Sequence, residues 1–381
     1  MQYKVLRIIY DWPNPWDGLA PAPYYLTKRQ LNLGNSVTVF CGRWKKSGGP
    51  ELIKNLKLQS FPREPIRGLM LLTTAPLMTL YFLIWRVFNK VDIYHIHGHF
   101  GLYIYLYKFI FGWLDKTPII SHFHNTTKGR IEDQKLNPSK DTLVEKFIHV
   151  PLSLLSDKIA VKVSAACVFV SKRNLEEAVK YYSADRSKCY VVESGVASEI
   201  FKPALKANLK IKSILYVGAL SERKNIHVLV ESLKYLPKAF TITLVGRGYE
   251  SYIHRLKKIA LDNKVAERVF FKGYVENADL VAFYKSSSVF AIPSTYEGLP
   301  KVVIESLACG TPVVASGFEI KSPITGLYFL NKATPKLLAS TIMDVVSLKK
   351  GVDVAYISKF YSWEAKAKEV QNIYDKIVSK I

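Results

Sequence analysis

Residues 289–316, VFAIPSTYEGLPKVVIESLACGTPVVAS, contain the pattern that decides the fold. Two short apolar runs typical of buried strands, 289–293 and 312–316, flank a segment with the spacing of a helix. A strand, a helix and a second strand in this order predict two parallel strands joined by a crossover. The segment is therefore a βαβ unit of a parallel sheet, with a polar loop after its first strand.

The same alternation continues along the whole chain of 381 residues. Strands are expected at 4–9, 36–40, 56–61, 92–96, 118–123, 166–170, 189–192, 213–217, 241–245, 268–273, 289–293 and 312–316. The pattern restarts after the Lys-rich stretch 202–212, which we interpret as a linker. We therefore predict an α/β protein with two doubly wound domains, 1–200 and 201–359, facing a central cleft. A last helix, 360–381, has one apolar stripe and is expected to pack back on the first domain.

The charge is strongly basic and evenly spread. The chain has 54 Lys and Arg against 31 Asp and Glu, and the net charge is +11 in residues 1–200 and +12 in 201–381. Even spreading argues against a basic nucleic-acid-binding arm and fits a surface that meets an anionic membrane leaflet. A general supply of Lys for solubility is the alternative. A hydrophobic fraction of 49% excludes a disordered chain.

Cysteine usage and the first residues favour a reducing, cytoplasmic location. The four Cys are far apart and form no CxxC or CxxH spacing, which argues against a disulfide scaffold and a zinc cluster. Residues 1–9 are an alternating apolar segment without the pattern of a cleavable signal peptide.

Two segments of the first half are unusually apolar. Residues 68–85 contain no charged side chain, and residues 100–113 contain seven aromatic side chains. Three interpretations stay open for 68–85: a transmembrane helix, a helix lying in the membrane interface, and a buried crossover helix. A transmembrane helix would separate residues 1–66 from the sheet that they should join.

The strongest chemical motif is Glu297 and Glu305, eight residues apart in the opening segment. Two carboxylates at this spacing can accept hydrogen bonds from a ligand that lies over the start of the helix. The backbone N–H groups of Leu299, Lys301 and Val302, at the start of that helix, can bind an anion. Pro300 lacks an N–H and suits a first helical turn. A solvated helix face with two chance glutamates is the alternative.

Other motifs follow predicted strands. In YVGALSERKN (216–225), Gly218 follows a strand, and the adjacent cations Arg223 and Lys224 precede a helix; such a pair suits a diphosphate. LVGRG (244–248) is a weaker glycine motif. The chain contains no GxxxxGK[ST] loop, so an ATPase of that type is excluded.

Five histidines lie at the ends of two successive predicted strands of the first half. They are His95, His97, His99, His122 and His124. We expect these histidines to face the cleft and to act as acids, bases or hydrogen-bonding groups there. The alternative is that they are structural. A zinc site is disfavoured because no Asp, Glu or His at a helical spacing completes the ligand set.

With these motifs in order, the chain resembles the retaining, nucleotide-sugar-dependent glycosyltransferases of family 4 (glycosyl transferases group 1), which have the GT-B fold of two Rossmann-like domains. The resemblance runs from LNLGNSVTVF (31–40) through SHFHNTTKG (121–129) and the E-x7-E segment to YSWEAKAKEVQNIY (361–374). It implies transfer of a hexose-type sugar from a UDP- or GDP-sugar, with an acceptor-side first domain, a donor-binding second domain and no metal or other cofactor. The acceptor expected from the apolar segments is a lipid-linked saccharide or glycolipid at the cytoplasmic membrane face.

The resemblance also implies roles for residues. Glu297 contacts the transferred sugar and Glu305 the ribose, and residues 299–302 offer backbone to the diphosphate. Arg223 and Lys224 neutralise the leaving phosphate, and His124 lies near sugar and acceptor. The loop at Gly18 closes over the phosphates, Gly218 lines the donor site, and Val275 receives the base.

The chain departs from the family pattern at two places that concern activity. Ala219 stands where an Arg is common, and the first loop lacks the usual Gly-Gly pair. These departures keep open a catalytically inactive, membrane-docked partner protein. A nucleotide-sugar epimerase of the same fold is a further alternative, and nothing in the sequence indicates nucleic-acid binding.

Overall fold

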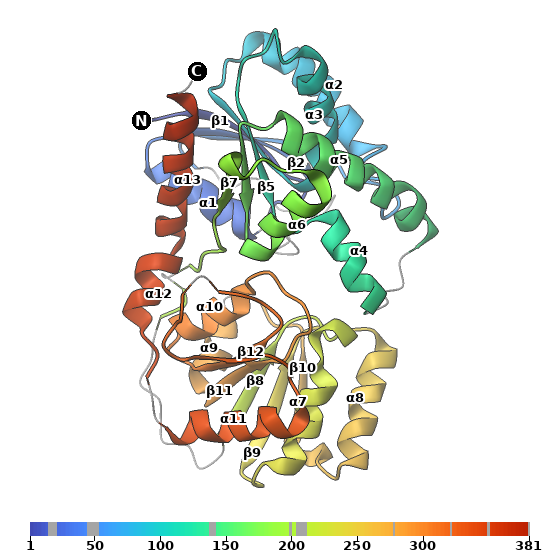
Figure 1. Ribbon diagram of the computed structural model, residues 1–381, viewed down its shortest axis with the longest axis vertical. Coiled ribbons are helices and arrows are strands. Elements are labelled where there is room, and N and C mark those ends of the chain that lie inside the picture. Colours follow the sequence, from blue (N-terminus) through green and yellow to red (C-terminus); the bar gives the residue numbers. More distant parts are fainter. Residues whose placement is uncertain are drawn as a thin grey trace. The chain divides into compact units, whose positions relative to one another are not determined.

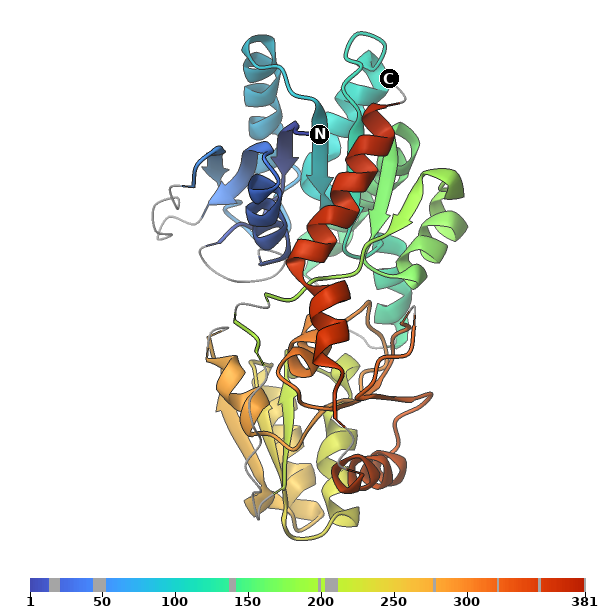
Figure 2. The same ribbon diagram turned by 90° about the vertical axis from the view of Figure 1, so that its left-hand side faces the viewer.

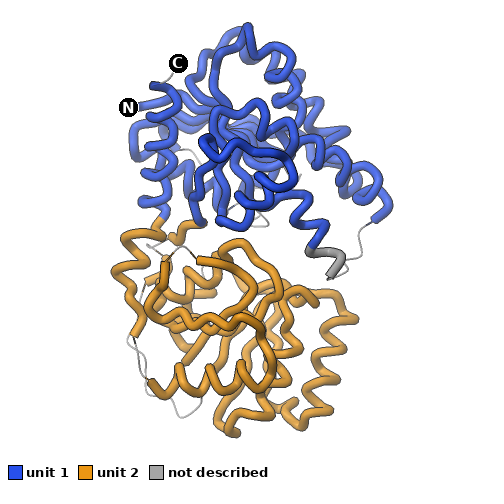
Figure 3. The backbone as a smooth tube through the Cα atoms, viewed as in Figure 1, with its two compact units in different colours: residues 1–193, 363–381 blue, residues 194–362 orange. Residues whose placement is uncertain are grey.

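The computed structural model describes residues 1–13, 21–43, 53–136, 142–197, 200–202, 212–276, 279–320, 322–348 and 351–379. The chain forms two compact units, residues 1–193 with 363–381 (unit 1) and residues 194–362 (unit 2) (Figure 3). The expected boundary lay at 200. Residues 194–202 belong instead with unit 2, because Val196 pairs with Ser362 and the Phe201 ring packs on Tyr284. Most of the expected linker, 202–212, lies outside the described residues.

Unit 1 contains a parallel sheet of seven strands in the order β3-β2-β1-β4-β5-β6-β7 (Figure 1). Its strands are β1 (Lys4–Ile8), β2 (Ser36–Arg43), β3 (Leu56–Pro62), β4 (Ile93–His97), β5 (Ile119–Phe123), β6 (Ala166–Phe169) and β7 (Cys189–Val191). Its helices are α1 (Pro21–Asn32), α2 (Thr74–Phe88), α3 (Leu102–Phe111), α4 (Thr127–Leu136), α5 (Val150–Val163), α6 (Lys172–Tyr182) and α13 (Trp363–Val378). Short helical turns are η1 (Gly98–Gly101), η2 (Glu145–His149) and η3 (Arg186–Lys188).

The sheet of unit 1 is covered on both faces, as its strands require. Alternate side chains such as Leu6 and Ile96 point into a core shared with α2, α3, α5 and α6. The opposite face meets α1 and α13, which pack against each other (Figure 2). Parallel strands buried on both faces explain the near-continuous apolar runs in the sequence.

Unit 2 contains a parallel sheet of six strands in the order β10-β9-β8-β11-β12-β13. Its strands are β8 (Lys212–Val217), β9 (Phe240–Val245), β10 (Val269–Gly273), β11 (Val289–Ile292), β12 (Val313–Ser316) and β13 (Leu327–Leu330). Its helices are α7 (Ile226–Ser232), α8 (Glu250–Asp262), α9 (Leu280–Ser286), α10 (Lys301–Ala308), α11 (Pro335–Ser347) and α12 (Val354–Tyr361), with short turns η4 (Glu222–Lys224), η5 (Leu233–Tyr235) and η6 (Ala266–Arg268).

The predicted fold class and all twelve predicted strands are confirmed. β13 was missed, because its sequence, LYFL, is short and two of its side chains are only half-buried. The unusual segment 68–85 forms α2 from Thr74 onward, a crossover helix between β3 and β4 that buries only one stripe. In the described part of the chain, no helix has the length and apolar character needed to cross a membrane.

Candidate donor site

The strand order of unit 2 reverses between β8 and β11. The chain builds β9 and β10 on one side of β8 and then returns to place β11 on the other side. In open α/β sheets, ligands bind outside the carboxyl ends of the strands at such a reversal. Arg223 and Lys224 follow β8, and Glu297 follows β11. The topology therefore places three of the predicted site residues at the position where a ligand is expected.

The loop after β8 depends on close approach to the loop after β9. Gly218 has a φ of 147°, and the Gly218 N–H donates to the carbonyl of Val245. A Cβ atom on Gly246 would lie 1.9 Å from the Gly218 carbonyl oxygen, so a side chain is excluded there. The two loops then continue side by side, with an isolated bridge between Leu220 and Gly248. This packing fixes where the following turn η4 presents its cations.

Glu297 is the centre of a polar cluster at this edge. Its Oε1 atom contacts Lys224 Nζ, lies 3.0 Å from Arg223 Nη1 and accepts a hydrogen bond of 2.9 Å from Ser294 Oγ. The Glu297 N–H donates to the Gly317 carbonyl at 2.6 Å, and Arg223 also donates to the Tyr296 carbonyl. Both the side chain and the backbone of Glu297 are thus held in place.

The electrostatics of this cluster favour an anionic ligand. Burial opposes ionisation of Glu297, but the charges of Lys224 and Arg223 outweigh it and lower the pKa of its carboxyl group. The ionised carboxylate faces two cations, so the cluster carries an excess positive charge. Adjacent Arg and Lys side chains suit the oxygens of a diphosphate.

α10 begins beside this cluster. Its first residues, Lys301 and Val302, have N–H groups that no carbonyl within the helix can accept, and the helix dipole adds partial positive charge there. Leu299 and Pro300 are buried and lead into the helix. Pro300 is the N-cap residue, one position earlier than the predicted first helical turn, because its ψ of 125° is extended rather than helical.

Glu305 lies one turn further along α10 and is partly buried. Tyr284 of α9 donates a hydrogen bond of 3.0 Å to Glu305 Oε2. Burial raises the pKa of Glu305, although Lys301 and the Tyr284 hydroxyl partly oppose the rise. Burial likewise lowers the pKa of Lys301, against the charge of Glu305. Tyr284 therefore fixes one oxygen of the Glu305 carboxylate. The carboxylate can still accept hydrogen bonds from a ligand.

Val275 follows β10 and is half-buried. The neighbouring Tyr274 ring lies 4.4 Å from the guanidinium carbon of Arg247, which comes from the loop after β9. The ends of β9 and β10 thus present an aromatic and cationic surface at the same edge of the sheet. Predicted residue Gly18 lies outside the described residues.

In unit 1, four histidines stack at the carboxyl ends of β4 and β5. The ring centroids of His95 and His97 are 4.5 Å apart, those of His97 and His122 are 4.8 Å apart, and those of His122 and His124 are 4.9 Å apart. His95 Nε2 lies 3.2 Å from His122 Nδ1, and His97 Nδ1 lies 3.2 Å from His124 Nε2. Alternation along two paired strands places all four imidazoles on one face.

The three inner imidazoles are closed off from solvent. His95, His97 and His122 are buried, and burial together with the Arg7 charge holds their pKa values well below the ordinary range. Their nitrogens lie close enough to share one metal ion. The Arg7 guanidinium, 3.4 Å from His95 Nδ1, repels such an ion. His124 is only partly buried and lies at the end of the stack.

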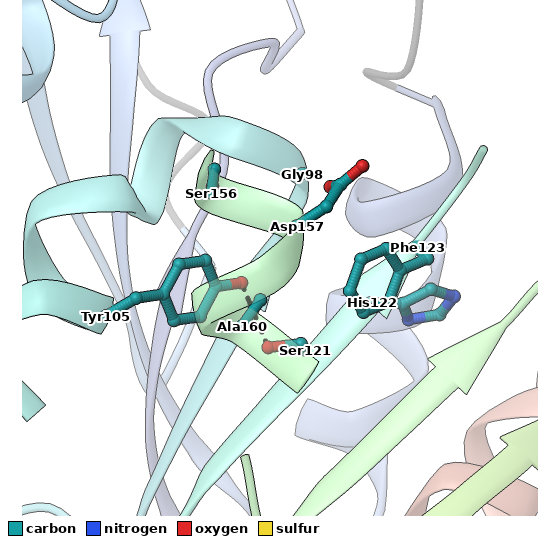
Figure 4. Close-up of a pocket in the computed structure, with 8 residues that line it drawn as sticks. All are labelled: Gly98, Tyr105, Ser121, His122, Phe123, Ser156, Asp157 and Ala160. Atoms are coloured by element: carbon teal, nitrogen blue, oxygen red, sulfur yellow. Dashed lines mark hydrogen bonds between the residues drawn. The ribbon is translucent and has the colours of Figure 1, made fainter. Parts of the chain in front are cut away.

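A small pocket of about 160 Å³ lies beside this stack (Figure 4). His122, Phe123, Gly98 and Asp157 line it, and the Tyr105 hydroxyl lies 3.0 Å from Ser121 Oγ at its wall. A water-sized sphere does not fit within it. The pocket is therefore too small for a saccharide and belongs to the packing of unit 1.

Three residues of these networks were missed from the sequence. Ser294 follows a predicted strand within the opening segment, so its position was a usable signal. Arg7 also had a signal, because it is the charge with apolar residues on both sides in the predicted strand 4–9. No sequence signal indicated Tyr284, because its helix precedes β11 and none of the motifs contains this residue.

Comparison with known proteins agrees with this arrangement. The family model for glycosyltransferase family 4 matches residues 16–199, and the model for glycosyl transferases group 1 matches residues 197–326. The chain belongs to these glycosyltransferases. The resemblance to family 4 and group 1 glycosyltransferases that was inferred from its motifs is thereby confirmed.

Relatives and solved structures extend the comparison. An uncharacterized glycosyltransferase of Methanocaldococcus jannaschii is 26% identical, over 82% of this chain and 85% of the relative. The sucrose-phosphate synthase of Thermosynechococcus elongatus has a TM-score of 0.77 at 17% identity, covering 99% of this chain and all of that chain. Anabaena HepE in complex with UDP-glucose has a TM-score of 0.71 at 15% identity and covers all of both chains. These structures show that the glycosyltransferase has the GT-B fold.

Proposed function

We propose that this glycosyltransferase moves a hexose-type sugar from a UDP- or GDP-sugar to a lipid-linked saccharide or glycolipid. The observation that carries the donor assignment is the Arg223–Lys224–Glu297 cluster at the strand-order reversal of unit 2. The cluster has an excess positive charge, and the negative charge of a nucleoside diphosphate would balance it. The UDP-glucose complex of Anabaena HepE supports a nucleotide sugar as donor.

The donor is held along the edge of the sheet. Arg223 and Lys224 contact the diphosphate, and the first N–H groups of α10 add neutral donors. Glu305, fixed by Tyr284, accepts hydrogen bonds from the ribose hydroxyls. The base lies at Val275, and Gly218 leaves the backbone room for the ligand to approach.

The reaction needs charge stabilisation more than a nucleophile. The bond between the anomeric carbon and the diphosphate oxygen breaks, and the cations stabilise the negative charge that develops on the leaving group. An acceptor hydroxyl attacks the same face of the sugar, so configuration is retained, and its proton passes to the departing phosphate oxygen. Glu297 orients the cations and the sugar, and His124 lies on the acceptor side. Because fixed cations take this task, we propose that transfer needs no metal ion.

Lipid acceptors are supported by the apolar segments of unit 1 and by the net charge of +23. A protein with such a surface fits a peripheral position on the cytoplasmic face of a membrane, where anionic lipids attract basic side chains. A lipid acceptor would then lie in the same membrane to which the protein binds.

Donor binding tests the first part of the proposal. The purified protein is heated with UDP-sugars and GDP-sugars, and selective stabilisation by one donor class is expected. Glu305→Ala should abolish the shift, whereas Glu250→Ala, on the exposed face of α8, should retain it. No stabilisation by any nucleotide sugar would overturn the donor assignment.

A further inference from the structure

α2 has a second apolar stripe that the fold leaves in solvent. Leu80, Ile84 and Val87 are 62%, 67% and 77% exposed. They lie opposite Met78 and Phe82, which are fully buried in the core of unit 1. A helix that is hydrophobic all round is usually buried on all sides. This helix therefore carries an apolar face that packing within unit 1 does not use.

The end of α3 extends this face. Phe109 and Ile110 are more than half exposed, as are Trp113 and Leu114 in the turn that follows. The two helices pack against each other, with the rings of Phe82 and Tyr107 5.5 Å apart (Figure 1). The carboxyl ends of both helices are therefore neighbours. We call the exposed apolar side chains of 77–88 and 109–114 together the α2–α3 surface.

A polar contact fixes the relation between the two helices. Arg86 near the end of α2 donates to Thr117 Oγ1 at 3.1 Å and lies 3.5 Å from Asp115, both of which follow α3. Asp115 also accepts a hydrogen bond from the Tyr94 hydroxyl. The α2–α3 surface is thus a rigid part of unit 1. Apolar patches larger than a few hundred Å² are rare on soluble monomers and mark interaction sites.

Most of the exposed charges around the α2–α3 surface are positive. Lys90 and Lys116 follow the two helices and are exposed, as are Lys158 and Lys162 on α5, which packs on α3. Lys162 lies 4.7 Å above the Phe109 ring. Asp115 and Asp157 are 7% and 2% exposed, and each is hydrogen-bonded within unit 1. Asp92, which follows Lys90, is exposed and accepts a hydrogen bond from the Lys4 N–H. The exposed lysines outnumber this one carboxylate, so a partner with an apolar interior and an anionic boundary fits this surface.

We propose that the α2–α3 surface inserts into the interfacial layer of a bilayer that contains anionic phospholipids. Leu80, Ile84 and Val87 enter the acyl boundary, and Trp113 lies at headgroup depth, where its amphipathic ring is favoured. The surrounding lysines meet the lipid phosphates. The proposal builds on the lipid acceptor of the proposed function and names the side of the enzyme that meets the membrane.

Sedimentation with vesicles tests the proposal without any nucleotide sugar. The full chain is mixed with vesicles of phosphatidylcholine containing about a third phosphatidylglycerol, and with pure phosphatidylcholine, at low and at high salt. We expect binding to the anionic vesicles that weakens with salt. Leu80→Ser with Ile84→Ser should lower the partition coefficient at least ten-fold, because several CH₂ and CH₃ groups no longer enter the membrane. Lys158→Gln with Lys162→Gln should lower it about ten-fold or more.

Matched controls come from the exposed surface of unit 2. Leu337→Ser with Leu348→Ser, and Lys238→Gln with Lys332→Gln, should bind as the unchanged protein does. Thermal unfolding and donor binding in the absence of lipid verify that every variant is folded. Because donor binding is measured separately, loss of vesicle binding and failure of the proposed donor site give different results.

Three results would overturn the proposal. One is equal binding to phosphatidylcholine alone. Another is that Leu80→Ser with Ile84→Ser binds the anionic vesicles as strongly as the unchanged protein does. The third is a dimer in solution that dissociates in Leu80→Ser with Ile84→Ser while vesicles are not bound, since it would make the α2–α3 surface an interface between two copies of the chain.

Discussion

Lys224 and Glu297 form an ion pair across 73 positions of the chain, because the strands before them, β8 and β11, are neighbours in the sheet of unit 2. Only 13% and 10% of their side chains are exposed. Arg223 and Ser294 contact the same carboxylate oxygen. A pair so held can keep cations oriented toward a diphosphate without rearrangement during the reaction.

Loss of Lys224 should destabilise unit 2 in a pH-dependent way. The pKa of Glu297 is lowered in the folded protein, so its contribution to stability is present above the unfolded-state pKa of about 4.5 and is lost as the pH falls through the folded value. In Lys224→Met, one of the two charges that lower the pKa of Glu297 against the effect of burial is missing, so this contribution to stability decreases. We expect a loss of about 3 kcal/mol in urea unfolding at pH 7, and a smaller loss at pH 4. Lys258→Met, which breaks an exposed pair with Asp262, should cost less than about 1 kcal/mol. Equal losses at both pH values would contradict the assignment.

Tyr284 should act as a positioning residue for Glu305. In Tyr284→Phe, Glu305 loses a hydrogen bond worth about 0.5–1.5 kcal/mol. The affinity for the nucleotide should fall by roughly two- to ten-fold, while the turnover of bound donor stays nearly unchanged. Isothermal titration with the nucleoside diphosphate measures this, with Tyr235→Phe on the surface as the control. An unchanged affinity would show that Glu305 does not need Tyr284.

The histidine stack should make unit 1 sensitive to acid. The pKa values of His95, His97 and His122 are depressed in the folded protein, so the unfolded state binds more protons below its ordinary pKa of about 6.5. Stability is therefore lost as the pH falls below about 6.5, by about 1.4 kcal/mol per pH unit for each imidazole. Urea unfolding between pH 7.5 and pH 5 measures this slope. Arg7→Met removes a positive charge beside His95 and so raises the pKa of His95 in the folded state. The loss of stability should then end at a higher pH than in the unchanged protein. A flat stability between pH 7.5 and pH 5 would contradict the account.

The C-terminal helix should be required for the stability of unit 1. The buried Tyr374 hydroxyl lies 2.6 Å from His95 Nδ1, and the Tyr374 ring packs edge-on against Tyr3. Tyr374→Ala should destabilise unit 1 by about 3–5 kcal/mol, as for other large aromatic truncations. Hydrogen exchange should then accelerate in β1 and β4 but not in β8. Exchange that rises equally in both sheets would show that the helix does not act on unit 1 alone.

Local patterns were sufficient for much of the fold. Apolar runs of the right length predicted twelve strands, because parallel strands buried on both faces leave a strong signal. The cations after β8 and the carboxylate after β11 were also found from their places beside strands. Strand pairing then brought them together at the edge where the topology directs ligands.

What the sequence could not show depends on contacts between distant segments. Tyr284 and Glu305 meet only because their helices, α9 and α10, both pack on the sheet of unit 2. The burial of the histidine stack depends on α13, whose Tyr374 comes 279 residues after His95. The apolar stripe of α2 was visible in sequence, but only the fold shows which side of the helix stays in solvent.

Release of nucleoside diphosphate tests the central claim most directly. The purified protein is incubated with UDP-sugars and GDP-sugars, a membrane lipid extract and EDTA, and Glu297→Gln is compared with Glu250→Gln. We expect lipid-dependent release that persists in EDTA, is retained in Glu250→Gln and falls at least 100-fold in Glu297→Gln, as expected when a group that organises transition-state charge is lost. Donor binding with no release, or release unaffected by Glu297→Gln, would contradict the account.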